Sequence, residues 1–578
     1  MTAVSAASHW LDQYASNEYR WQRVANNVQT TTYYRPLGLV ELAFDADGRY
    51  YEGRADITTL LELATIPDVD RRQLRERIGL AWTALRYQHA LLQARAVSLA
   101  SITGDGPASA TNVGFAIDVR RTLDEARAEA TKHLLFLGEF YDSVDVSDFR
   151  SHCMNSSRLI DPSENLAKLF VFPSQTPENG HGMLRVLLVA SHQILDGLSS
   201  YVWMRDLIHL LNLDESQLQH RVLSLMEPTG FQDRLPLPQE ALYPPIAGSA
   251  ARRRWFWLLT RILRHVRKSL PAGFENPLRR KAPRESVPHS PIYASVLDYS
   301  RTPPLNTESG RVSITTQNTQ RLHRLCRETK ASIGAGCFAL VAVVMMELHE
   351  LRFPDIPLSE RRPFITGFPL NPRAFFNHHT EPNSLMLAFS DGIALPFLPS
   401  HLDLDGRIRL LARQAHRQLA AYQKRARPAG DDAKQYMSSR GAGRILANQY
   451  LSSIERSDAL LPPHLRRGVN PQGAYPMRAN HSVQTNGISS IGRADAVLKQ
   501  GMYDLDDESR DFVADFRSIT SNVRARDGEF LVGIGGSDVG LWANASIDTC
   551  AMDPQLVEQW KMRLEHVLDS PGAEKARL

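Results

Sequence analysis

The chain has 578 residues, of which 43% are hydrophobic and 22% are charged, and its formal net charge is +4. A chain of this length and composition can bury two sizeable cores, which excludes an intrinsically disordered protein. The positive charge is too mild to indicate a nucleic-acid partner. We therefore expect a protein of two domains, monomeric and without nucleic acid.

The N-terminal residues contain no apolar core of the kind found in signal peptides. The longest apolar run, residues 337–346, is shorter than the 18 or so residues that span a bilayer. These two observations predict a cytoplasmic protein. The cysteines Cys153, Cys326, Cys337 and Cys550 are scattered without metal-ligand spacing, so we expect reduced packing residues and no metal site.

A single histidine stands at a predicted turn between a strand and a helix. Residues 183–190 are apolar and rich in branched side chains, which predicts a mostly buried strand. His192 follows in the string Ser-His-Gln-Ile-Leu-Asp-Gly, and helical spacing of apolar residues begins at residue 198. Asp196 is placed to cap that helix, and Gly197 suits a tight turn. A general base at this turn could reach a substrate.

Two interpretations of His192 are open on these residues alone. It is either a catalytic base or a core histidine with satisfied hydrogen bonds. The spacing of four residues would let Asp196 orient His192 in a triad-like pair on a regular helix. The turn between strand and helix makes that pairing unsafe.

A second histidine, His401, begins the similar string His-Leu-Asp-Leu-Asp-Gly. It follows a Pro-rich segment rather than a buried strand, and a helix-like segment follows it. This pattern is typical of a helix start at Asp403 or Asp405, so we interpret the second copy as structural.

The stretch from residue 236 to residue 291 is rich in Pro and Arg, which predicts a linker. The chain then divides into an N-terminal half (residues 1–235), this linker, and a C-terminal half (residues 292–578). Within the linker, residues 252–270 hold seven Arg or Lys among Trp, Leu and Ile. That helix could contact an anionic membrane as a peripheral anchor, or pack its apolar residues on the protein, which we favour.

Several segments, taken in chain order, resemble the chloramphenicol acetyltransferase-like superfamily. This superfamily includes BAHD acyltransferases, alcohol acetyltransferases and the condensation domains of nonribosomal peptide synthetases. The resembling segments are residues 72–96, 183–197, 312–351, 364–373, 486–492 and 540–568. The first of them ends in a degenerate Arg-His-Pro-Leu-like signature in which Ala90 replaces proline.

The resemblance implies two similar α/β halves that pack as a pseudodimer with a tunnel between them. It makes His192 the catalytic general base, near the middle of the tunnel. It also implies that Asp196 points away from the substrate and pairs with Arg373, so that Asp196, Gly197 and Arg373 support the motif. Ser489 and Ser490, in the segment where asparagine is common, are possible donors to an oxyanion.

Within the superfamily, the chain most resembles fungal O-acyltransferases of secondary metabolism, such as those that acetylate trichothecenes. Ser191 stands where condensation domains usually carry a second histidine, and no Asp-Phe-Gly-Trp-Gly-like string of the BAHD type occurs near the C-terminus. We expect a coenzyme A-dependent O-acyltransferase that acts on a small hydroxylated metabolite. Acyl-CoA would be a co-substrate, and no permanently bound cofactor is expected.

Two alternatives stay open. One is a condensation-domain-like enzyme that takes its acyl group from a carrier protein, or forms an amide or a ring. The other is a non-catalytic ligand-binding member of the fold. Two local questions are also open: arginines of residues 252–270 could attract the phosphates of coenzyme A, and residues 425–480, rich in Gly, Pro, Ser and Arg, suggest an insertion or a lid near the tunnel.

Overall fold

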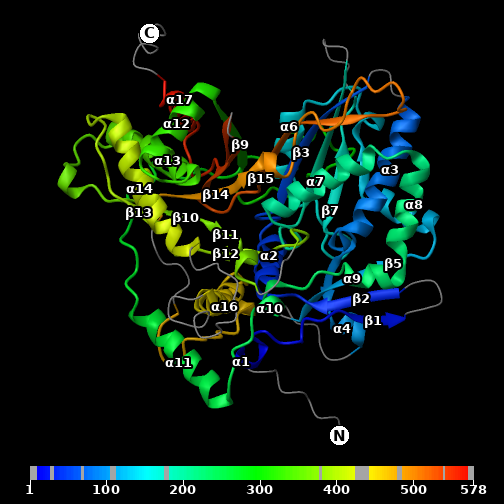
Figure 1. The fold of residues 1–578 in the computed structure, drawn as a ribbon, viewed down its shortest axis with the longest axis horizontal. Helices are drawn as coiled ribbons and strands as arrows, with labels where there is room; N and C mark the ends of the chain where they lie inside the picture. Colours follow the sequence, from blue (N-terminus) through cyan, green and yellow to red (C-terminus); the bar gives the residue numbers. More distant parts are fainter. Residues whose placement is uncertain are drawn as a thin grey trace.

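The structure is a computed structural model that describes residues 10–25, 31–66, 70–104, 112–174, 181–376, 381–423, 442–477, 484–537 and 540–569. The N-terminal and C-terminal halves of the chain lie side by side, and each is built on a β-sheet with helices against it (Figure 1). Each half also has its own hydrophobic core. The α/β class expected from the sequence is confirmed.

The N-terminal half contains a five-stranded and a four-stranded sheet. In spatial order the strands of the first are β15 (Ala514–Val523), β3 (Ile57–Thr65), β8 (Gly182–Ala190), β7 (Ala167–Val171) and β6 (Leu134–Phe136). Those of the second are β1 (Gln22–Ala25), β2 (Thr31–Pro36), β5 (Val113–Val119) and β4 (Arg95–Ser98). The main helices are α2 (Leu39–Tyr50), α3 (Arg71–Gln88), α5 (Leu123–Thr131), α6 (Val146–Asn155), α7 (Gly197–Leu211) and α8 (Glu215–Met226).

The C-terminal half is built on a six-stranded sheet. Its strands in spatial order are β13 (Ile393–Leu395), β10 (Phe364–Gly367), β14 (Asn486–Arg493), β16 (Phe530–Gly536), β17 (Leu541–Asp548) and β9 (Thr307–Ile314). A short ribbon pairs β11 (Pro369–Leu370) with β12 (Ala388–Phe389). The helices are α12 (Thr316–Glu328), α13 (Ile333–Arg352), α14 (Leu404–Gln423), α16 (Ala442–Ala459) and α17 (Pro554–His566).

One strand from the C-terminal half completes the sheet of the N-terminal half. β15 pairs antiparallel with β3, from Ala514 opposite Thr65 to Val523 opposite Ile57. Phe512 and Ile519 belong to the N-terminal core. The next strand, β16, returns to the C-terminal sheet. This crossing joins the two sheets at the level of the predicted motif, because β3 also pairs with β8, the strand that precedes His192.

The segments predicted around the motif form the expected elements. Residues 183–190 lie in β8, which is mostly buried, and the helix predicted from residue 198 is α7. His89, at the end of α3, lies 2.9 Å from Asp206 of α7 and so ties these two helices together. The second His-x-x-x-Asp-Gly string starts α14, where Asp403 accepts the N–H of Gly406 at 2.7 Å. The structural interpretation of that copy is confirmed.

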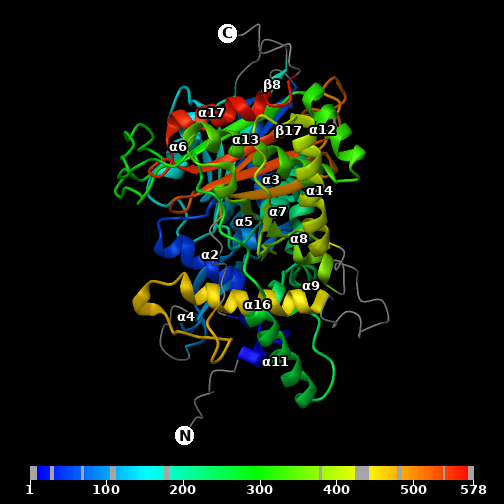
Figure 2. The same cartoon turned by 90° about the vertical axis from the view of Figure 1, so that its left-hand side faces the viewer.

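The predicted linker carries α10 (Gln239–Leu242) and α11 (Ala250–Val266), and α11 lies at the lower edge of the molecule beside α16 (Figure 2). Phe256 and Trp257 of α11 are buried in a third cluster with α16, whereas Trp255 and Val266 are exposed. The helix thus packs on the protein along one side only. Of the residues 425–480, the part the structure describes contains α16; residues 425–441 and 478–480 lie outside the described residues.

The apolar run at residues 337–346 belongs to the 20-residue helix α13. Within the described residues it is the one helix long and apolar enough to span a bilayer, and 78% of its apolar window is buried inside the protein. The four cysteines are free and buried, as expected of packing residues.

Candidate active site

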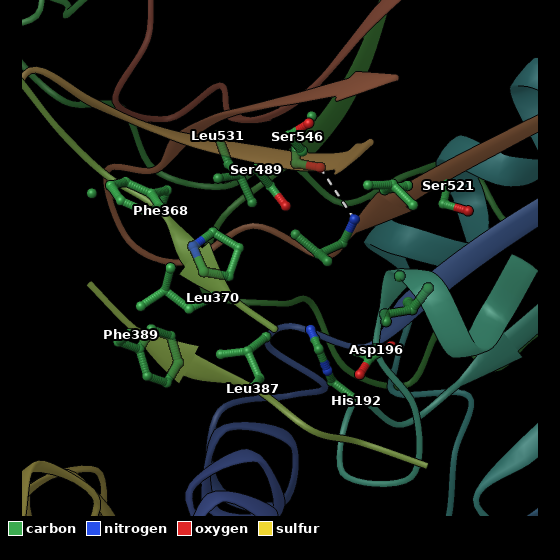
Figure 3. A pocket seen from close by; sticks show the side chains of 18 of the residues that line it. His192, Asp196, Phe368, Leu370, Leu387, Phe389, Ser489, Ser521, Leu531 and Ser546 are labelled. Carbon is green, nitrogen blue, oxygen red and sulfur yellow. Dashed lines mark hydrogen bonds between the residues drawn. The ribbon is translucent and has the colours of Figure 1, made fainter. Parts of the chain in front are cut away.

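The turn from β8 to α7 presents His192 at the interface between the two halves. Ser191 N–H donates to Leu166 O, and Ile194 N–H donates to Ser191 O at 3.2 Å, so the backbone turns sharply after the strand. Asp196 caps α7 by accepting the N–H of Ser199 at 2.8 Å. Between these two fixed points the His192 side chain projects into a cavity (Figure 3).

Asp196 binds an arginine from the other half and does not orient His192. Its Oδ2 lies 2.9 Å from Arg373 Nη2 and also accepts the N–H of Met386 at 3.0 Å. Both partners of the ion pair are buried. The triad-like arrangement allowed by spacing is therefore absent among the described residues, because Oδ1 caps α7 and Oδ2 binds Arg373 and Met386 of the other half.

A strip of extended chain from the C-terminal half holds the same loop. Leu385 N–H donates to Ile194 O at 3.2 Å, and Ser384 O accepts from Arg373 Nη2 at 2.6 Å. Beyond Arg373, Phe375 and Phe376 are buried in the cluster that contains residues of α11 and α16. The loop that carries His192 is thus clamped from the C-terminal half by backbone hydrogen bonds and one buried ion pair.

Gly197 is not in a left-handed conformation. A Cβ added there would lie 3.5 Å from Ile491, an ordinary contact distance. The backbone turns earlier, at residues 191–194, and Gly197 is the first residue of α7.

The His192 ring is stacked on an aromatic ring from α2. The centroids of His192 and Phe44 are 4.0 Å apart and their planes differ by 16°. Burial lowers the pKa of His192 to about 4, and repulsion from Arg526 acts in the same direction. His192 is therefore a neutral imidazole at physiological pH, the form that can accept a proton.

Arg526 also contacts the Phe44 ring. Its guanidinium is 5.7 Å from the Phe44 ring centre and binds Asp47 of α2 at 2.9 Å and Glu529 at 3.5 Å. Burial alone would lower the pKa of Arg526, but Asp47 and Glu529 raise it, so the group keeps its charge. This charge opposes protonation of His192.

The cavity around His192 has a volume of about 610 Å³ and is lined by both halves. Its apolar lining includes Phe44, Leu198, Phe368, Leu370, Leu387, Phe389 and Leu531. Polar and charged side chains from both halves also line it, so the cavity can hold a small ligand that has an apolar skeleton and several polar groups.

Both predicted serines line the cavity, but they are not equivalent. The Ser489 hydroxyl points into the space above His192 (Figure 3), and within the described residues it has no hydrogen-bond partner. Ser490 is exposed, and its hydroxyl accepts the N–H of Gly492 at 3.3 Å. Ser489 is thus the serine with a donor available to a ligand.

Ser191, next to the histidine, faces the protein interior. Its hydroxyl accepts from Arg158 at 3.3 Å, and Arg158 forms a buried ion pair with Asp56 at 2.8 Å. Ser191 is absent from the described cavity wall. Ser191 therefore supports the turn on the side that faces the protein interior, through its hydrogen bond with Arg158.

Three residues of the site were not predicted from the sequence: Phe44, Arg456 and Arg526. Phe44 comes from a helix about 150 positions before His192, and no sequence pattern links the two. Arg526 and Arg456 belong to segments without a recognisable motif, and only the packing of both halves brings them to the cavity.

The fold is similar to that of solved structures, although their sequences differ greatly. Trichothecene 15-O-acetyltransferase from Fusarium sporotrichioides matches with a TM-score of 0.60 at 11% identity, over 95% of this chain and 97% of that one. The first condensation domain of the CDA synthetase matches with a TM-score of 0.50 at 11% identity, over 95% and 98%. A four-domain nonribosomal peptide synthetase matches with a TM-score of 0.50 at 12% identity, over 98% of this chain and 34% of that one.

No family model and no curated protein sequence matches the chain. The structural similarity nevertheless shows the fold: two chloramphenicol acetyltransferase-like subdomains that form a pseudodimer, as expected from the sequence. The acetyltransferase and the condensation domain share this fold, so it does not by itself choose between their reactions.

The first prediction concerns the protonation of His192. A ¹³C-labelled histidine titration followed by NMR, with His192→Ala to assign the signal, should give a midpoint well below the ordinary value of about 6.5. Arg526→Met should move this midpoint upward, because it removes a repelling charge and leaves Asp47 with only its longer contact to Arg54, at 3.9 Å. A wild-type midpoint at or above 6.5 would contradict the buried, neutral imidazole.

The second prediction concerns the ion pair that clamps the loop. Arg373→Ala should lower the free energy of unfolding by about 3–5 kcal/mol, because it leaves a buried carboxylate unpaired. Asp196→Ala should cost a similar amount, and the double variant should cost less than the sum. As a control, Arg493→Ala breaks the exposed pair with Asp495 and should cost at most about 1 kcal/mol in chemical denaturation. Equal costs for Arg373→Ala and Arg493→Ala would show that the clamp is unimportant.

Proposed function

We propose that this protein is a coenzyme A-dependent O-acyltransferase that acylates a hydroxyl group of a small, largely apolar metabolite. The observation that carries the proposal is a neutral His192 ring in the wall of a cavity enclosed by both halves, with the free hydroxyl of Ser489 above it. An acetyl or another short acyl group fits this proposal.

The reaction needs a base, because an alcohol at neutral pH is a poor nucleophile. In the proposed mechanism His192 takes the proton of the acceptor hydroxyl as its oxygen attacks the thioester carbonyl. The new C–O bond forms, the carbonyl oxygen becomes an oxyanion, and the C–S bond then breaks. The imidazolium returns its proton to the departing thiolate, so that free coenzyme A and an ester are produced and no acyl-enzyme is required.

The low pKa of His192 has two consequences for this mechanism. It keeps the base free of protons at physiological pH, but it also makes it a weak base. We propose that His192 becomes more basic as the reaction proceeds. The oxyanion formed on attack is a new negative charge near the ring, and it stabilises the imidazolium. Ser489 is placed to donate a hydrogen bond into the cavity, and an oxyanion is the group that would use it.

Asp196 and Arg373 would act as positioning residues. They touch the loop and each other, and their pairing leaves the His192 ring free to face the cavity. The apolar lining supports a hydrophobic acceptor, since burial of such a surface favours binding.

A second candidate is a condensation-domain-like enzyme that takes its acyl group from a carrier protein, or that forms an amide or a ring. The fold shared with a condensation domain supports it. Such an enzyme would ignore acyl-CoA and accept an acyl group on a phosphopantetheine arm. A non-catalytic ligand-binding protein would bind acceptors without releasing thiol from either donor.

The third prediction tests these functions together. Thiol release is measured with a panel of acyl-CoAs and mixed hydroxylated terpenoid and polyketide acceptors. We expect acceptor-dependent release that falls about 100- to 10,000-fold in His192→Ala. The control His401→Ala changes the histidine of the second, structural motif and should leave the rate unchanged.

Other outcomes separate the candidates. Release that survives in His192→Ala would refute the proposed base. If no acyl-CoA reacts, the same acceptors are assayed with acyl groups on a carrier protein, and turnover there identifies the condensation-like enzyme. Acceptor binding without turnover of either donor leaves the ligand-binding role.

A further inference from the structure

One guanidinium in the wall of the cavity is not paired with a carboxylate of the described residues. Arg456, from α16, lines the cavity, and its guanidinium lies 3.6 Å from the Phe389 ring centre. Within the described part of the chain, its side chain makes no hydrogen bond and no ion pair. The pKa of Arg456 is lowered to about 10, first by burial and then by repulsion from Arg526. It still carries its charge at neutral pH.

The other two arginines of the cavity wall are compensated. Arg373 is paired with Asp196, and Arg526 is paired with both Asp47 and Glu529. Arg456 is only partly buried, so its charge is partly solvated, but a guanidinium that faces a cavity without a carboxylate partner is still available to an anionic ligand. An aromatic ring beneath a guanidinium leaves its N–H donors free for a ligand.

We infer that Arg456 binds an oxyanion of the acceptor, and hence that the acceptor is a hydroxy acid whose carboxylate lies on Arg456 while its hydroxyl lies at His192. This inference rests on the proposed function, because it names the substrate class of the same cavity. A guanidinium presents paired N–H groups that match a carboxylate in a bidentate geometry. The apolar wall between the two ends would hold the carbon skeleton.

The position of Arg456 favours the acceptor over the phosphates of coenzyme A as the source of the anion. Its stacking partner Phe389 is two residues from Leu387, a separation of about 7 Å along an extended chain. Leu387 lies between Phe389 and His192 (Figure 3). The anion site and the base are therefore neighbours in one cavity. The first phosphate of acyl-CoA lies beyond the whole pantetheine arm from its thioester, a larger separation.

The test uses hydroxylated terpenoid and polyketide acids, each paired with its own methyl ester, with acyl-CoA as donor. We expect the wild type to favour the acid in kcat/KM by about tenfold or more, and Arg456→Met to remove that preference. Arg456→Lys should retain part of it, because it keeps the charge but not the planar donor pair.

Arg444→Met is the matched control. Arg444 is on the same helix and stacks 4.3 Å from the Phe256 ring centre, but it lies outside the described lining of the cavity. This variant should keep the acid preference. Equal use of acids and esters by the wild type would overturn the inference. So would a higher KM for acyl-CoA in Arg456→Met with the acid-to-ester ratio unchanged, because the anion would then be a phosphate of the donor.

A binding measurement separates failure of this inference from failure of the proposed function. Thermal stabilisation by the acids, but not by their esters, should be lost in Arg456→Met and kept in His192→Ala. That result would support the anion site even if no acceptor were acylated. Equal stabilisation by acids and esters in the wild type would overturn the site whether or not acyl transfer occurs.

A different observation supports a second inference, on α11. The helix has two apolar sides. Its packed side holds Phe256 and Trp257, and its other side carries residues at helical spacing that remain exposed or half-buried. These are Trp255 (58% exposed), Leu258 (37%), Ile262 and Val266 (64%). Exposed arginines occupy positions 252–254 at the start of the helix, and an exposed Lys268 follows its end.

We infer that this outer side of α11 rests on an anionic membrane surface. The apolar stripe with Trp255 would insert at the boundary between headgroups and acyl chains. The flanking basic residues would bind the anionic headgroups. The inner side is held by α16, where Arg264 binds Glu455, so the helix keeps this orientation without lipid. The helix α11 lies at the edge of the molecule, away from the sheets (Figures 1 and 2).

The test is sedimentation of the full chain with vesicles of phosphatidylcholine alone or with phosphatidylserine. Binding should require phosphatidylserine, weaken with salt, and fall about tenfold or more in Trp255→Glu/Val266→Glu. Leu223→Glu changes an equally exposed leucine on α8 (50% exposed) and should bind like the wild type. Absence of binding at low salt would overturn the inference. So would light scattering that detects a dimer lost in the double variant, because the stripe would then join two copies of the chain.

Discussion

The buried pair between Asp196 and Arg373 is the contact on which the candidate site depends. It joins the start of α7 in one half to a short helical turn in the other, and the strip that contains Ser384 and Leu385 binds the same loop through its backbone. Because both side chains are largely buried, loss of either one would leave the other as a buried charge without a partner, which is costly. The two halves are thereby held in one register, and the cavity between them keeps its shape.

A second constraint sets the chemistry of His192. Its ring stacks on Phe44, and Arg526 lies near the same ring, so burial and a nearby positive charge both favour the neutral imidazole. Arg526 itself is stable there only because Asp47 and Glu529 bind it. The cavity thus holds an uncharged base, His192, and two arginines, Arg373 and Arg526, whose charges are neutralised by carboxylates. Arg456, the exception to this pairing, is for that reason the informative residue of the wall.

The crossing of β15 into the N-terminal sheet explains how residues so distant in sequence share one site. The segment that leads from β14 to β16 passes through the other half, pairs with β3, and returns. As a result Ser489, before the crossing, and Arg526, after it, both lie in the same cavity wall. The pseudodimer is therefore an interlocked unit, and its active-site candidate belongs to neither half alone.

The sequence by itself determined the local elements and their order. A short apolar run rich in branched side chains predicted β8, helical spacing predicted α7, the context of His401 marked its motif as a helix start, and the order of resembling segments predicted the pseudodimer. Spacing alone could not decide what Asp196 binds, because it permits a partner in the loop or across the interface; the resemblance named Arg373, and the two residues are paired in the tertiary structure. The sequence did not predict the roles of Phe44, Arg456 and Arg526. Sequence periodicity describes contacts within one element, whereas these residues reach His192 or its cavity only through packing between elements far apart in the chain.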